Sequence, residues 1–112
     1  MASDRPDLTK RSDRIMTLHP AGKQGVRIER TKYEAMRRAV LRCVPRSAGG
    51  VALADLADRV IDALDASVFG PGVGVMWYLI TVKQDLEARG EIEQVPGVRP
   101  QHLRRPRRRI VP

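Results

Sequence analysis

The side chains most able to do chemistry in this sequence are arginines near its C-terminal end. Six of them lie between residues 99 and 112, and no acidic residue accompanies them. Each guanidinium can neutralise one phosphate of a nucleic acid, although phosphate contacts carry no base identity. We therefore expect phosphates to be held by a hairpin ending near residue 104 and by the tail after it, through Arg99, Arg104, Arg105, Arg107, Arg108 and Arg109.

A helix expected over residues 74–89 carries a second group of candidate residues. In a helix-turn-helix protein such a helix enters the major groove, where polar side chains contact base edges. Thr81, Lys83 and Gln84 would then face the groove, and Lys83 is the only charged residue among them. Trp77 and Tyr78 allow two interpretations, either aromatic residues at the edge of the core or an exposed patch that binds a partner.

Catalytic and metal sites are not indicated by the sequence. His19, His102 and Cys43 have no zinc-ligand spacing. The run from Gly22 to Gly25 contains a lysine between glycines, but it lacks the spacing and the Ser or Thr of a phosphate-binding loop. We expect no enzyme activity, no metal and no cofactor.

Length and composition limit the chain to one small domain with tails. It has 112 residues, of which 42% are hydrophobic, and one cysteine, which excludes an intramolecular disulfide. No segment approaches the roughly 18 apolar residues of a membrane span, and no secretory signal is visible at the N-terminus. A cytoplasmic protein without a membrane partner is expected.

The net charge of +8 is unevenly distributed along the chain. Residues 25–48 hold seven basic and two acidic side chains, whereas residues 49–98 hold three and eight. Residues 99–112 hold six and none. A polyanionic partner would therefore be held by the first helix and the C-terminal tail.

Apolar residues recur at helical spacing in three segments. The sequence predicts helices over residues 31–44, 53–65 and 74–89, the first opened by a capping box of Thr31 and Glu34. We expect Leu79, Val82 and Leu86 of the third helix to be buried against the first two helices, on the side chains of Val40, Leu56 and Val60.

The third helix is followed by a glycine that can end it and then by a predicted turn. Gly90 stands where a helix C-terminus needs a positive φ, and Pro96-Gly97 fits the centre of a type II turn. The pattern predicts a β-hairpin over residues 91–104, with a short strand at Val51 beside it. The expected fold is α+β, a winged helix-turn-helix with a three-helix core and a C-terminal hairpin wing.

The run from Leu86 to Glu93 resembles the junction between helix and wing in winged-helix transcriptional regulators. More closely, residues 16–104 resemble a family of small, uncharacterised bacterial proteins, a family of unknown function. The resemblance is carried by His19-Pro20, Gly22-Lys23, Gly25-Val26, Ile28, Lys32-Tyr33, Trp77-Tyr78, Thr81-Val82-Lys83 and Asp85-Leu86-Glu87-Ala88-Arg89. The sequence departs from the family at Gln84 and in both tails. The resemblance implies a winged-helix fold and no enzyme activity.

Two functions follow as hypotheses. The first is binding of double-stranded DNA, as a transcriptional regulator or a nucleoid-associated factor. The second is a winged-helix module that binds another protein or forms a homodimer without DNA, with Trp77 and Tyr78 at the contact. The expected organisation is a disordered arm over residues 1–14, a winged-helix domain over 15–104 and a basic disordered tail over 105–112.

Overall fold

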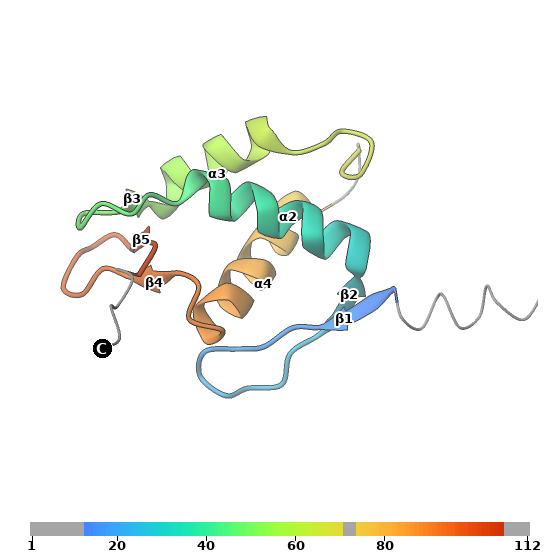
Figure 1. The fold of residues 1–112 in the computed structure, drawn as a ribbon, viewed down its shortest axis with the longest axis horizontal. Coiled ribbons are helices and arrows are strands. Elements are labelled where there is room, and N and C mark those ends of the chain that lie inside the picture. Colours follow the sequence, from blue (N-terminus) through green and yellow to red (C-terminus); the bar gives the residue numbers. More distant parts are fainter. Residues whose placement is uncertain (1–12, 71–73, 107–112) are drawn as a thin grey trace, which may run out of the picture.

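The computed structural model describes residues 13–70 and 74–106. In these residues it is an α+β fold of three helices and two small antiparallel sheets (Figure 1). In chain order the elements are β1 (Arg14–Met16), β2 (Arg27–Glu29), α2 (Arg30–Cys43), β3 (Val51–Ala52), α3 (Leu53–Ala63), α4 (Val75–Ala88), β4 (Glu93–Gln94) and β5 (His102–Arg104).

The three helices surround one hydrophobic core. α2 packs against both α3 and α4, and α3 also contacts α4. The predicted helix bounds are confirmed to within two residues at each end. The predicted core is also confirmed, because the following side chains are fully buried: Val40, Leu56, Val60, Leu79, Val82 and Leu86.

The predicted capping box at the first helix is wrong. α2 begins at Arg30, one residue before Thr31, and no side chain caps its N-terminus. The Glu34 carboxylate lies 3.7 Å from the Arg30 guanidinium instead of reaching back to the backbone. β2 runs directly into α2, and the Arg30 backbone N–H donates to the carbonyl of Asp13. The backbone at Asp13 therefore supplies an acceptor that a side-chain cap would otherwise provide.

The strands form two separate antiparallel sheets. β1 pairs with β2, so that Ile15 lies opposite Ile28. In the second sheet β5 is central, between β3 and β4, with Val51 and Gln94 both opposite Leu103. The short strand expected at Val51 is confirmed. It forms an edge strand of the sheet, and Val51 pairs with the fully buried Leu103.

The predicted C-terminal hairpin is wrong in its extent. Gly90 and Gly97 have the positive φ values expected of them, 79° and 73°. However, β4 and β5 have two and three residues, and the chain from Val98 to Gln101 is not a strand. Pro100 lacks a backbone N–H and cannot join a ladder, which explains why the second strand begins only at His102.

The predicted boundaries of both tails are wrong, because each tail includes a residue that belongs to the folded part. Arg14 belongs to β1. Arg105 belongs to the folded part, since its backbone N–H donates to the Pro45 carbonyl at 2.7 Å. Residues 1–12 of the predicted arm, and the tail from residue 107, lie outside the described residues. No helix in the described part of the chain is long and apolar enough to cross a membrane.

Replacing Leu86 by alanine should lower the free energy of unfolding by about 2–5 kcal/mol, because the side chain is fully buried in the core. Urea denaturation measures this change. Val98→Ala is the matched control, because Val98 is exposed, and it should change the stability by no more than about 0.5 kcal/mol. Equal stabilities of the two variants would show that Leu86 does not belong to the core.

Candidate nucleic-acid interface

Lys83 does not face solvent, and the prediction that it faces a DNA groove is wrong. Only 4% of the residue is exposed. Its Nζ donates to Glu87 Oε1 at 2.6 Å and to Gln101 Oε1 at 3.0 Å. Glu87 also accepts from Gln94 Nε2 at 2.8 Å. The buried ion pair with Glu87 within α4 neutralises the charge of Lys83, and the hydrogen bonds with Gln101 and Gln94 link α4 to the chain of the second sheet.

The other predicted groove residues lie in a shallow hollow. Thr81 and Gln84 are half-buried on one side of α4 and face the loop between β1 and β2. Trp77 forms the edge of the same hollow, whose volume is about 90 Å³. α4 itself contributes no free cation here, because Lys83 is buried and paired with Glu87. The arrangement offers little attraction for phosphates.

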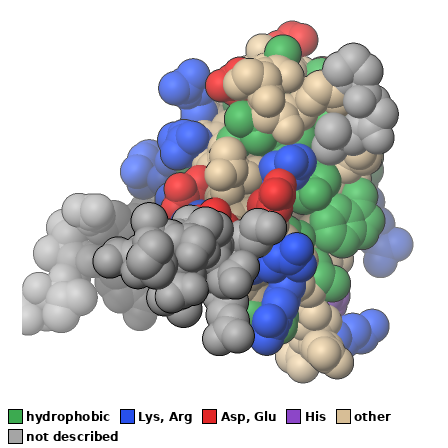
Figure 2. Space-filling model, turned by 90° about the vertical axis from the view of Figure 1, so that its right-hand side faces the viewer, with side chains coloured by type: hydrophobic (Ala, Val, Ile, Leu, Met, Phe, Trp, Pro, Cys, Tyr) green, Lys and Arg blue, Asp and Glu red, His purple; other side chains and the backbone are tan. Residues whose placement is uncertain are grey.

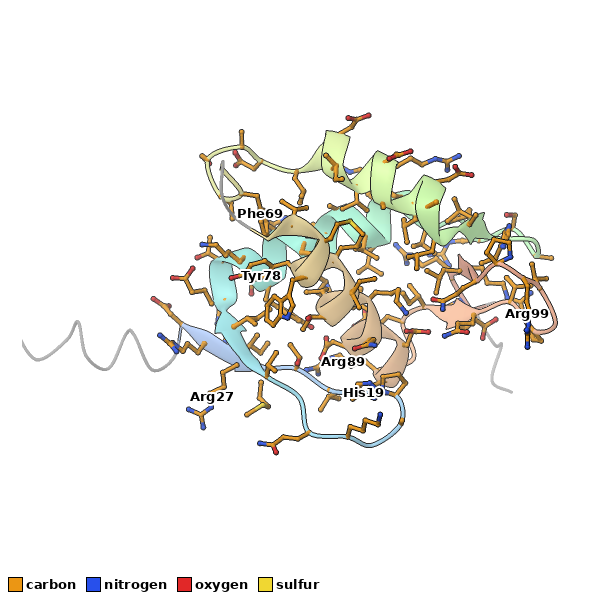
Figure 3. All side chains as sticks on the ribbon, turned by 180° about the vertical axis from the view of Figure 1, so that it is seen from behind. His19, Arg27, Phe69, Tyr78, Arg89 and Arg99 are labelled. Carbon is orange, nitrogen blue, oxygen red and sulfur yellow. The ribbon has the colours of Figure 1, made fainter. Side chains whose placement is uncertain are left out.

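The two aromatic residues of α4 have different surroundings. Trp77 is 50% exposed, and its ring meets the Tyr78 ring edge-on at 5.0 Å. Tyr78 is half-buried against the core and meets Phe69 edge-on at 5.4 Å. Of the pair, Trp77 offers the larger free surface to a partner. Tyr78 and Phe69 lie at the same end of α4 in Figure 3.

A buried carboxylate holds the loop between β1 and β2 on α4. Asp85 is completely buried and accepts three hydrogen bonds. Its Oδ1 accepts from the Leu18 backbone N–H at 2.8 Å, and its Oδ2 accepts from the Tyr33 hydroxyl at 2.5 Å and from Arg89 Nε at 2.9 Å. Three segments that are distant in sequence are thus joined at one side chain. The hollow beside Trp77 exists because this loop is fixed there.

The same loop depends on a close approach of two backbones. Thr17 is buried, its N–H donates to the Val26 carbonyl at 2.8 Å, and its hydroxyl accepts from the Val26 N–H at 3.0 Å. A Cβ at Gly25 would overlap the Thr17 carbonyl. Glycine is therefore required at position 25 for steric reasons. The hydrogen-bonded turn of this loop lies just before it, where the Gly22 N–H donates to the His19 carbonyl at 2.9 Å.

Tyr33 has an altered acidity because of these contacts. Burial, and then the hydrogen bond to Asp85, raise the pKa of the Tyr33 hydroxyl from 10.0 to about 12. The bond to Asp85 also raises the pKa of the Arg89 guanidinium. Both groups keep their protons near neutral pH, so the network is in its fully bonded form there.

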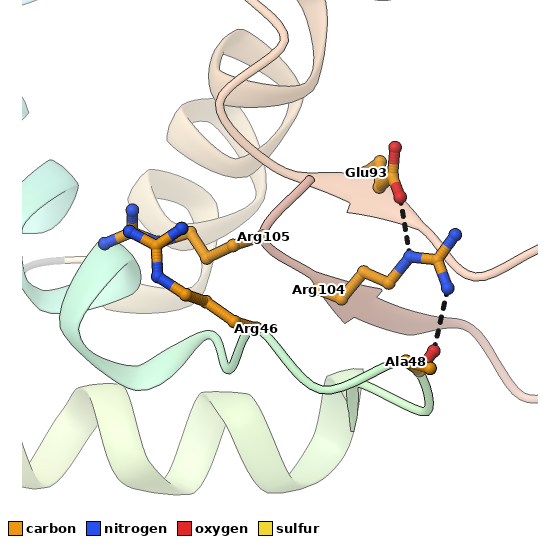
Figure 4. A pocket seen from close by; sticks show the side chains of 5 residues that line it. All are labelled: Arg46, Ala48, Glu93, Arg104 and Arg105. Carbon is orange, nitrogen blue, oxygen red and sulfur yellow. Dashed lines mark hydrogen bonds and ion pairs between the residues drawn. The ribbon is translucent and has the colours of Figure 1, made fainter. Parts of the chain in front are cut away.

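Three arginines gather around a different hollow, between the α2–β3 loop and the end of β5 (Figure 4). Its volume is about 150 Å³, and it is lined by Arg46, Ala48, Glu93, Arg104 and Arg105. Arg104 points away from the other two, donating to Glu93 Oε2 at 2.6 Å and to the Ala48 carbonyl at 2.8 Å. Its predicted role in phosphate binding is weakened, because Glu93 already neutralises it.

Arg46 and Arg105 both line this hollow, and in the view of Figure 4 their guanidinium groups lie on the same side of it. Arg105 donates from Nε and Nη2 to the Leu41 carbonyl at the end of α2, at 3.3 and 2.8 Å, which leaves its remaining N–H groups available. Arg46 has no carboxylate within ion-pair distance among the described residues, and it is exposed. The hollow thus carries two guanidiniums without a counterion of their own in this part of the chain.

The remaining predicted phosphate contacts lie elsewhere or outside the described chain. Arg99 is exposed in the loop between β4 and β5, where Figure 3 labels it. Arg107, Arg108 and Arg109 lie outside the described residues, although Arg105 brings the chain to the arginine hollow just before them. Sequence reasoning missed Arg46 and Asp85. Asp85 occupies a position three residues after Val82 on the buried stripe of α4, which was the signal available for it.

The described residues contain no group of three His, Cys, Asp or Glu side chains that could hold a metal ion. The chemistry that the arrangement supports is electrostatic. Two guanidiniums line one hollow at the end of β5, and a second hollow lies on α4, where the helix contributes no free charge.

The ionisation of Tyr33 should make the fold sensitive to high pH. Because the pKa is about 12 in the folded chain against 10.0 for a free tyrosine, this hydroxyl contributes stability that is complete below about pH 10 and is lost as pH rises toward 12. We expect the stability advantage of the parent over Tyr33→Phe, measured by urea denaturation, to shrink over this interval. An advantage that stays constant would contradict the buried contact with Asp85.

Comparison with known proteins gives a family but no function. No curated protein and no solved structure matches the chain significantly. A family model matches residues 14–103, which run from the first residue of β1 to the middle of β5. The matched segment thus covers almost all of the fold, and it ends just before Arg104 and Arg105. The chain belongs to a family of unknown function (DUF6958).

Proposed function

We propose that this protein binds double-stranded DNA through the phosphate backbone, using Arg46, Arg105 and the arginines that follow in the tail. The observation that carries the proposal is that two guanidiniums without an ion-pair partner among the described residues line one hollow. Two like charges that line one hollow repel each other, and an anion bound in the hollow would offset this repulsion. A guanidinium group can donate two parallel N–H···O hydrogen bonds to the oxygens of one phosphate.

The position of the hollow in the chain supports the same proposal. Arg105 is anchored by its backbone to Pro45 and by its side chain to Leu41. The sequence then supplies three more arginines within four residues, at 107, 108 and 109. A phosphate held between Arg46 and Arg105 would therefore lie close to where this basic segment begins. Several contacts made together would give an affinity that depends strongly on salt.

The order of the elements supports a winged-helix fold for the proposed DNA-binding domain. Three helices precede β4 and β5, and a short strand between the first two helices pairs with β5. Winged-helix proteins combine these parts, and many bind DNA by inserting the third helix into the major groove. Here α4 offers no unpaired cation, so we propose that binding is carried by the arginine end and does not select a base sequence.

This lack of base contacts favours a nucleoid-associated or architectural role over an operator-specific regulator. The proposal also includes a cytoplasmic location and no enzyme activity. Asp55, Asp58 and Asp62 on α3 would be repelled by phosphates, so α3 should face away from the duplex.

Replacing Arg46 by glutamine should weaken binding to a random-sequence duplex and lower its salt dependence. Removing one phosphate contact should reduce the slope of log affinity against log salt by about 0.9. Fluorescence anisotropy at several salt concentrations measures both quantities. Arg59→Gln is the matched control, because Arg59 is an exposed arginine on α3 that does not line the arginine hollow, and its replacement removes the same charge.

Deleting residues 107–112 provides a second measurement on the same surface. It should weaken binding equally for duplexes of different sequence and lower the slope further. Equal losses of affinity for Arg46→Gln and Arg59→Gln would indicate only a response to net charge and would contradict the proposed site. Absence of binding at low salt would contradict DNA binding as the function.

A further inference from the structure

Five large apolar side chains are exposed around the loop that joins β1 to β2 and the first turn of α4. Each is between 39% and 50% exposed, and we call them the apolar patch: Met16, Leu18, Val26, Met76 and Trp77. Figure 2 shows hydrophobic side chains gathered on the right of the face that it draws. Exposed apolar patches of this kind mark sites where another molecule binds.

The residues of the apolar patch are held in place by the fold and are not scattered over the surface. Thr17 is buried between Met16 and Leu18, so these two neighbours point outward from the same extended segment. Leu18, Val26 and Trp77 line one hollow. The hydrogen bond from the Leu18 N–H to the buried Asp85 fixes this side of the hollow. The surface is therefore preformed for a partner.

The margin of the patch is positively charged. Lys23 lies in the loop and Arg27 in β2, and both are exposed. Neither has a carboxylate within ion-pair distance in residues 13–70 and 74–106. A partner that fits this surface needs apolar side chains for the patch and acidic side chains for its margin.

The outer face of α3 has these two properties. Asp55, Asp58 and Asp62 are exposed at spacings of three and four residues, which places them on one face of the helix. Ile61 lies beside them and is 47% exposed. No cation of the described chain forms an ion pair with these three aspartates. Like charges at such spacings destabilise a helix, and Asp62 also opposes the helix dipole.

α3 and the apolar patch cannot meet within one molecule. α3 runs along the upper edge of the fold and the β1–β2 loop along the lower edge, in both Figure 1 and Figure 3. We propose that α3 of one copy docks on the apolar patch of the next copy, so that the protein associates head to tail. A two-fold contact of the patch with itself would instead bring Lys23 and Arg27 of two copies together.

A head-to-tail contact uses two different surfaces, so it continues into a chain or closes into a ring. It leaves the arginine hollow free, because this hollow involves neither α3 nor the β1–β2 loop. The contact requires no DNA, so its test and the test of DNA binding can fail separately.

Sedimentation velocity of the full chain without nucleic acid tests the proposal. At low salt the mean mass should rise beyond that of a dimer between micromolar and sub-millimolar concentration, and high salt should reduce it. The variant Asp58→Lys/Asp62→Lys alters α3, and Trp77→Ser alters the patch. Each should raise the dissociation constant of self-association by about tenfold or more. Val98→Ser, at an exposed valine outside both surfaces, is the matched control and should associate like the parent.

Mixing the two variants distinguishes a head-to-tail contact from a two-fold one. The α3 variant keeps an intact patch and the Trp77 variant keeps an intact α3, so the mixture should form a heterodimer and stop there. A parent that stays monomeric at all concentrations would overturn the proposal. It would also be overturned if the mixture stayed monomeric while the parent associates, or if the α3 variant associated like the parent. Circular dichroism of each variant confirms that it is folded.

Discussion

The carboxylate of Asp85 lies in the interior without access to water, and burying such a charge is costly unless hydrogen-bond donors surround it. Here the donors come from three places in the chain: the backbone of Leu18, the Tyr33 hydroxyl and the Arg89 guanidinium. These hydrogen bonds fix the β1–β2 loop against α4. They also fix α2 against α4 and the loop. The apolar patch and the hollow beside Trp77 depend on these hydrogen bonds, and the bond to Asp85 adds to the effect of burial in raising the pKa of Tyr33. Removing one donor would leave the charge only partly compensated.

Charge is separated over the surface of this small fold. The arginine hollow lies at the end where β5 finishes, the acidic face lies on α3, and the apolar patch with its basic margin lies at the opposite edge from α3. The cations that pair with carboxylates, such as Lys83 and Arg104, hold elements together, whereas Arg46 has no such carboxylate among the described residues and can contact an external anion. The proposed DNA binding uses the arginine hollow, whereas the proposed self-association uses the acidic face of α3 and the apolar patch. An assembly of this kind would present many arginine hollows along one duplex.

The sequence was sufficient for the helices and their core because apolar spacing is a local property of the chain. Val40, Leu56 and Leu86 could be assigned to the interior from periodicity alone. Burial of Lys83 could not be anticipated, because one of its acceptors, Gln101, is far away in sequence and reaches it only through the second sheet. The extent of β5 was misjudged because the ladder cannot include Pro100. Arg46 was overlooked because its significance comes from Arg105, which the fold brings to it.

We propose that nucleic acid contacts the arginine hollow and not α4. The most direct measurement is a two-dimensional NMR titration of isotope-labelled protein with a random-sequence duplex, at low salt and at a protein concentration where the chain is monomeric. The largest changes should occur at the backbone amides of residues 46–48 and 103–105 and at the Arg46 and Arg105 side chains. The Trp77 indole, which belongs to the only tryptophan in the chain, should stay unchanged. Largest changes at the Trp77 indole and at the Thr81 and Gln84 amides would contradict the account and return α4 to the DNA interface.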